Sequence, residues 1–270
     1  MSVHSDLRLA TAQSASSTAR EASFTIHDLP QELTTTILRN LEEIDSSTSR
    51  GVCRLWRDLT PTPAGLKIFG HKAWEKYYGL EIKDCPPIPE GIIEITTNLQ
   101  EKLKVREEAP DCSLLLMPKG LTLNQLRELA EQPKMGYGSK FSKLCYKVSD
   151  VYGDQEIEES YWVLMTNSMI EESKMKTYAE QQALIQEKTE GVCQLPHLLE
   201  VAICCFMNHV SEDRYMFGWR PQIYTRCQEE IDDQHVFVGG YYESGLSIDR
   251  RVDSFTSSSY GIAACRRFDS

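Results

Sequence analysis

A patterned stretch from Ile26 to Leu59 constrains the fold of this 270-residue chain more than any other feature. Asp28 can cap a helix that starts at Leu29-Pro30, because Gln31 completes a capping box and proline is tolerated in a first helical turn. Aliphatic side chains recur every four residues and lie on one helix face, which Leu38 widens. They are Leu29, Leu33, Ile37 and Leu41. The spacing predicts an amphipathic helix with a buried apolar face.

A second apolar edge follows this helix. Asp45 can cap the next helix, and Val52, Trp56 and Leu59 provide it and its successor with apolar side chains. So short a helical unit buries little surface by itself, since the buried fraction falls with chain size. We therefore expect it to pack on a partner or on a following domain.

The unit resembles an F-box. The resemblance is carried by Leu-Pro at 29–30, Ile-Leu at 37–38 and Val-Cys-Arg-Leu-Trp-Arg at 52–57. It implies docking on the Skp-type adaptor of a cullin ubiquitin ligase and recruitment of an unknown target protein. The implied adaptor-binding residues are Leu29, Pro30, Ile37 and Leu38, and the implied core residues are Leu33, Leu41, Val52 and Trp56. The alternative is a plain helical hairpin in a larger α-rich core.

One segment departs from the F-box pattern. Where leucines usually open the second helix, this chain has Ser46, Ser47, Thr48 and Ser49. Hydroxyl groups thus replace part of the apolar edge, and this lowers the adaptor affinity that we expect.

Charge and hydropathy exclude several classes of function. The net charge of -11 disfavours nucleic acid and anionic membranes, which are bound through basic faces, and also disfavours an acidic partner. The longest apolar run, from Val201 to Met207, is far shorter than the roughly 20 residues of a spanning helix. We therefore expect a soluble cytoplasmic protein.

The first 23 residues differ in composition from the rest, with six Ser, two Thr and five Ala. Such a polar segment is predicted to be disordered, and it lacks the apolar core of a secretory signal. It is similar to the leaders of bacterial type III secretion substrates, and an ordinary flexible terminus is the alternative.

Nine cysteines without a Cys-x-x-Cys pair indicate a reducing compartment. Cys193 with His197, and Cys205 with His209, are each four residues apart and could face one another on a helix as metal ligands. The segment from Leu195 to Val210 has the composition of a buried helix, in which free cysteine acts as a small core residue. We favour core packing, and we expect no metal and no cofactor.

The remaining pattern predicts an α+β domain with a strand-rich carboxy-terminal part. Residues 66–80 are expected to form a helix that extends the F-box-like unit, and the prolines at 86, 87 and 89 mark a boundary. The predicted organisation is a leader at 1–23, an F-box-like unit at 24–80 and the α+β domain at 85–270. Its expected helices are 121–131, 177–188 and 196–210, and its expected strands are 113–117, 161–166, 236–242, 245–248 and 260–268.

Several phrases after residue 24 are also similar to the carboxy-terminal module of F-box-like proteins from amoeba-infecting relatives of chlamydiae. This resemblance implies a bacterial effector secreted into a host cytosol, where an adaptor is present. It rests on Ile68-Phe69-Gly70, Trp74 to Gly79, Leu121-Thr122-Leu123, Ser160 to Thr166, Tyr178 to Gln182, Tyr224 to Glu229 and Val238-Gly239-Gly240.

A thiol-dependent enzyme in the second domain is the leading alternative function. Its best trio is Cys227 with His235 and one acid from Asp232, Asp233 or Asp249, because a thiol nucleophile needs a base and an orienting group. No family signature surrounds Cys227, so we favour an inert strand cysteine. Residues 135–140 lack the spacing of a phosphate loop and predict a turn. Trp219, Tyr224 and Arg226 are of types that form binding hot spots or simply fill a core.

Overall fold

The computed structural model describes residues 65–103, 111–217 and 222–268. The polar leader and every residue of the expected adaptor-binding set lie outside the described residues. The same holds for the expected F-box core and for the serines at 46, 47 and 49. The described structure therefore concerns the second part of the chain.

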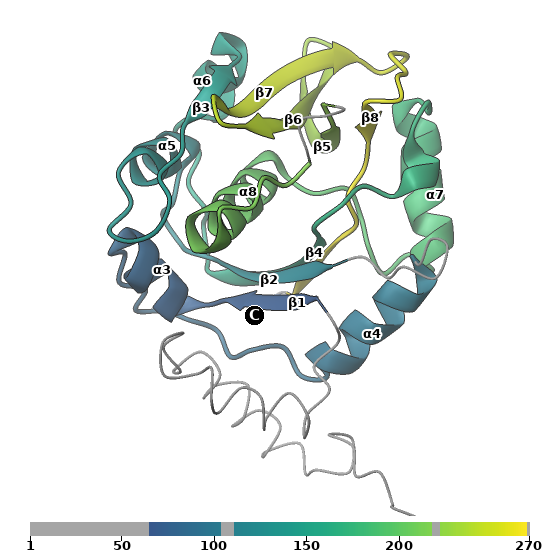
Figure 1. The fold of residues 1–270 in the computed structure, drawn as a ribbon. Coiled ribbons are helices and arrows are strands. Elements are labelled where there is room, and N and C mark those ends of the chain that lie inside the picture. The colour runs from purple at the N-terminus through teal and green to yellow at the C-terminus, as the bar shows by residue number, and fades with distance from the viewer. Residues whose placement is uncertain (1–64, 104–110, 218–221, 269–270) are drawn as a thin grey trace, which may run out of the picture.

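Helix α8 (Leu198–Glu212) lies between two β-sheets (Figure 1). The strand order is β1-β2-β4-β9 in one sheet and β3-β7-β6-β5-β8 in the other. This arrangement confirms the α+β class and the strand-rich carboxy-terminal part. The strands are β1 (Leu66–Phe69), β2 (Cys112–Met117), β3 (Phe141–Leu144), β4 (Tyr161–Thr166), β5 (Tyr224–Ile231), β6 (Gln234–Tyr242), β7 (Gly245–Val252), β8 (Tyr260–Gly261) and β9 (Cys265–Phe268).

Helix α8 forms the centre of the core because its side chains are apolar around nearly its whole circumference. Twelve of its 15 residues are buried, among them Cys204 and Cys205. Their burial confirms the interpretation of these cysteines as core residues. None of the helices in the described ranges is long and apolar enough to cross a bilayer.

The other described helices surround this core, with α3, α5 and α6 on one side and α4 and α7 on the other (Figure 1). Helix α5 starts at a capping box, in which Gln125 N donates to Thr122 Oγ1 and Thr122 N donates to Gln125 Oε1. The predicted helices at 121–131, 177–188 and 196–210 are confirmed as α5, α7 and α8. The bounds are α3 (His71–Tyr78), α4 (Ile92–Lys102), α5 (Leu123–Glu131), α6 (Tyr146–Tyr152), the 3₁₀ turn η2 (Glu171–Ser173) and α7 (Tyr178–Thr189).

The expectation of one helix over residues 66–80 is wrong. This segment forms strand β1 and helix α3, and β1 pairs in parallel with β2. Trp74 Nε1 donates a hydrogen bond to the Leu116 carbonyl at 2.9 Å, so α3 is anchored on the same sheet. The aromatic spacing after Gly70 does indicate a helix, but the pairing of β1 with a strand far along the chain overrides a helical reading of 66–69. Residues 66–80 thus pack with the α+β domain.

The carboxy-terminal segment 260–268 connects the two sheets. Strand β8 pairs with β5, whereas β9 pairs with β4 in the other sheet. The linking residues Ile262, Ala263 and Ala264 are fully buried. One predicted strand is therefore two, because small apolar residues let the chain cross the core beside α8.

Candidate functional site

The proposed thiol trio is not assembled. Cys227 is completely buried, and burial, reinforced by the negative charge of Glu229, raises the pKa of its thiol well above the ordinary value. His235 lies elsewhere: its ring stacks on Tyr178 with 3.6 Å between centroids, and its Nε2 is 3.3 Å from Asp253 Oδ1. Successive residues of a strand point to opposite faces, and it is Arg226 that shares the face of Phe237 and His235. Cys227 thus has no base beside it.

Two of the three acids proposed for that trio, Asp232 and Asp249, have other partners. Asp232 pairs with Lys147 and Arg250, and Asp249 pairs with Lys143 at 2.9 Å. The hydrogen bond from Lys147 lowers the pKa of the Asp232 carboxyl. These carboxylates therefore serve surface ion pairs between neighbouring elements.

The pairs Cys193 with His197 and Cys205 with His209 do not belong to any metal-binding group in the described part of the chain. Burial raises the pKa of the Cys193 thiol to about 11, while His197 Nδ1 lies 2.9 Å from Glu229 Oε1. His209 Nε2 lies 3.3 Å from the Gly138 carbonyl. Within the part of the chain that the structure describes, no group of three or more His, Cys, Asp or Glu side chains could hold a metal ion.

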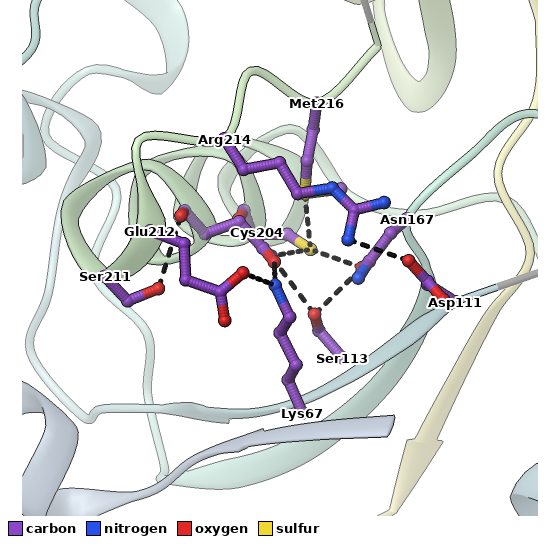
Figure 2. Close-up of polar contacts among 10 residues, drawn as sticks. Lys67, Asp111, Ser113, Asn167, Cys204, Ser211, Glu212, Arg214 and Met216 are labelled. Atoms are coloured by element: carbon purple, nitrogen blue, oxygen red, sulfur yellow. Dashed lines mark hydrogen bonds and ion pairs between the residues drawn. The ribbon is translucent and has the colours of Figure 1, made fainter. Parts of the chain in front are cut away.

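A polar network joins the carboxy-terminal half of α8 to the four-stranded sheet (Figure 2). Asn208 Nδ2 donates to Ser113 Oγ at 3.1 Å, and Ser113 Oγ donates to Asn167 Oδ1 at 2.8 Å. Lys67 Nζ donates to Asn208 Oδ1 at 3.2 Å and pairs with Glu212. The Ser113 hydroxyl is engaged both as donor and as acceptor, and the lysine contacts the amide rather than the serine. The network therefore holds α8 on the sheet and lacks the base–nucleophile contact that catalysis requires.

The opposite end of α8 carries a buried ion pair. Glu200 is fully buried and accepts hydrogen bonds from Arg267 Nε at 2.5 Å and Arg267 Nη2 at 3.1 Å. It also accepts hydrogen bonds from the Tyr161 hydroxyl and the His197 amide. Burial alone would lower the pKa of the Arg267 guanidinium, but its bond to Glu200 raises that pKa above the ordinary value. This pair fixes α8 to β4 and β9.

A pocket of about 410 Å³ opens beside this end of α8. Its lining combines apolar side chains such as Leu198 with the carboxylates of Glu156, Glu158 and Glu159, and His197 stands at its wall. The Nδ1 atom of His197 lies 2.9 Å from Glu229 Oε1. An apolar wall beside several carboxylates suits the binding of a ligand.

A second pocket, of about 530 Å³, lies at the other sheet between β3, the start of β5 and the turn from β6 to β7. We call it the lysine pocket. Cross-strand partners share a face of a sheet, and the pairings of Tyr224 with Gly239, Gly239 with Ser247 and Ser247 with Lys143 place these side chains on one face. The lining includes Lys140, Ser142, Lys143, Tyr224, Tyr242 and Ser244.

Glycines shape the wall of the lysine pocket. The register of β6 against β7 shifts between Gly239 and Tyr242, and Gly240 has φ +54. A Cβ at Gly240 would lie 2.5 Å from the Tyr224 hydroxyl oxygen, so a side chain at this position would require the tyrosine to move. The ring of Tyr224 stacks on Tyr260 with 5.1 Å between centroids. Burial raises the pKa of the Tyr224 hydroxyl.

Comparison with protein-family models, with curated proteins and with solved structures gave no match. The function is therefore inferred from the sequence and the geometry of the chain. Sequence reasoning singled out Tyr224 as a hot-spot type but missed Lys140, Lys143 and Tyr242. A possible sequence signal is the presence of Lys140 and Lys143 just after the glycine-rich turn at 136–138, because an acidic chain has few such local concentrations of positive charge.

Proposed function

We propose that this protein recruits targets to a cullin ubiquitin ligase. In this proposal residues 26–59 bind a Skp-type adaptor, and the α+β domain binds the target. The observation that carries the proposal is the order and spacing of Leu29-Pro30, Ile37-Leu38 and the Val52 to Arg57 phrase, which resembles an F-box.

The geometry of the second part of the chain supports binding over catalysis. Cys227 and His235 form no hydrogen bond with each other, and the Cys227 thiol is buried and protonated. Two open pockets, by contrast, offer shaped surfaces with charged rims. A recruiting subunit needs such surfaces and needs no nucleophile of its own, because other subunits of the ligase carry out the chemistry.

The likeness to F-box-like proteins of amoeba-infecting chlamydiae supports action in the cytosol of a host cell. An effector secreted into a host cytosol meets the adaptor there, and the polar leader at 1–23 suits such delivery. The target is then a host protein, and the α+β domain selects it.

The experiment is capture of purified Skp-type adaptor and cullin by the full chain. We expect Leu29→Ala with Pro30→Ala to weaken adaptor binding by about 2 kcal/mol, or roughly 30-fold, as expected for central anchors of an interface. A matched truncation of an exposed apolar residue elsewhere, Val192→Ala, should leave binding unchanged. Undetectable binding of the unaltered chain at micromolar concentration would refute the proposal.

A further inference from the structure

The lysine pocket is a basic site in an acidic protein. Its lining contains the ammonium groups of Lys140 and Lys143, and none of its lining residues is acidic. The chain as a whole carries a net charge of -11. Net charge averages over the whole surface, whereas a ligand responds to the potential of the pocket that it enters. The pocket thus departs from the expectation, drawn from net charge, that an acidic partner is disfavoured.

The ammonium groups of the pocket differ in their partners. The Lys140 ammonium group is exposed and makes no hydrogen bond or ion pair with any residue that the structure describes, while the Lys140 carbonyl accepts a hydrogen bond from the Leu246 amide. Lys143 is 2.9 Å from Asp249, but Asp249 is also 2.7 Å from Arg251, so this carboxylate is shared between two cations. The local balance remains positive.

A buried arginine lies on the same face of the sheet as Tyr224, although it does not line the pocket. Arg226 lies two residues beyond Tyr224 on β5 and is fully buried. Its Nη2 donates to the Phe255 carbonyl, while its Nε and Nη1 have no hydrogen-bond partner. Among the described residues no carboxylate forms an ion pair with Arg226, although the negative charge of Asp253 acts on the guanidinium and offsets part of its charge.

We propose that the lysine pocket binds an acidic segment of a partner protein. Aspartate or glutamate carboxylates of that segment bind Lys140 and Lys143, and the hydroxyls of Tyr242 and Ser244 donate further hydrogen bonds. The stacked rings of Tyr224 and Tyr260 provide a rigid surface for the segment. The inference depends on the proposed function only in taking the bearer of the segment to be the recruited target.

The size of the pocket favours a peptide over a single small anion. Its volume of about 530 Å³ exceeds the needs of one carboxylate, and it lies in the range of sites that hold molecules of several residues or drug size. Lys140 and Lys143 are three positions apart, and the register of β3 shifts between Phe141 and Lys143. Both lysines line the pocket, so they can bind two carboxylates of one extended segment.

The test uses the full chain and a fluorescein-labelled peptide of eight glutamates, with binding followed by fluorescence anisotropy. The acidic chain as a whole repels this peptide, so nonspecific attraction cannot mimic a positive result. We expect binding at low salt that weakens as salt rises, because exposed charges are screened.

Lysine variants locate the site. Lys140→Gln with Lys143→Gln should weaken peptide binding about tenfold. Lys147→Gln removes one positive charge on α6 outside the pocket and should change binding less than about twofold. All three positions are on the surface, and unchanged circular dichroism checks the fold.

Three outcomes would overturn the proposal: no binding at millimolar peptide, equal binding by the double variant, or full displacement by inorganic phosphate at the peptide's own concentration, which would indicate a small-anion site. The double variant should still capture the adaptor. If the unaltered chain does not capture the adaptor but binds the peptide, the proposed recruiting function is refuted and the proposal for the lysine pocket stands.

Discussion

Removal of the buried carboxylate at Glu200 should destabilise the α+β domain strongly. Glu200→Ala leaves the Arg267 guanidinium without its anion, and it removes the acceptor of the Tyr161 hydroxyl and of the His197 amide at the start of α8. Each of these groups would then lie in the core or at its edge with an unsatisfied donor. The perturbation therefore acts where β4, β9 and α8 meet.

The magnitude follows from the burial of the two partners. Breaking a buried ion pair by removing one member costs about 3 to 5 kcal/mol. The Arg267 side chain is 19% exposed and can regain some hydration. We therefore expect the free energy of unfolding to fall by about 3 kcal/mol, at the lower end of this range. That is a large share of the roughly 5 to 15 kcal/mol by which domains are stable.

Urea unfolding followed by far-ultraviolet circular dichroism measures the loss. Glu187→Ala, which removes an exposed helical glutamate from α7, is the matched control and should cost less than about 1 kcal/mol. Replacing both partners, with Glu200→Met and Arg267→Met, should restore about half of the loss, because no charge then stays buried without a partner. A Glu200→Ala chain as stable as the control, or a double variant that is the least stable of the set, would refute this reasoning.

Two further predictions concern titratable groups of the core. In the folded chain, Cys227 should resist a thiol reagent at neutral pH and react only after unfolding, because its thiol is buried and protonated. The variant Cys227→Ser should leave target ubiquitination unchanged. Rapid, selective labelling of Cys227 would instead favour a thiol enzyme. Burial lowers the pKa of the His209 imidazole below its ordinary 6.5, despite the opposing effects of the Gly138 carbonyl and Asp213. The unfolded chain then binds a proton more readily, so the contribution of neutral His209 is present above pH 6.5 and is lost as the pH falls through that value. Melting temperatures from pH 8 to pH 5 should fall less steeply for His209→Gln, and identical slopes for the two chains would contradict this assignment.

Local patterns of the sequence determined much of the second domain. The apolar runs that became β2 and β4 are fully or almost fully buried, as central strands require. The helices expected at 121–131 and 177–188 are present as α5 and α7, and the structure shows that each begins at a threonine capping box. Periodicity and capping act within a few residues, so a single sequence is enough to reveal them. The F-box-like pattern from Leu29 to Trp56 is local in the same way and remains a prediction.

Only the tertiary structure decided which segments meet. Strand β1 was missed because its four residues gain stability by pairing with β2, more than 40 positions away. Cys227 and His235 are close in sequence, yet strand alternation and the pairing of β5 with β6 leave them on different faces. The lysine pocket joins residues near 140 to others near 224 and 244, and the bulge at Gly239-Gly240 shapes it. Contacts between distant segments depend on the packing of the whole core around α8, and no local pattern encodes them.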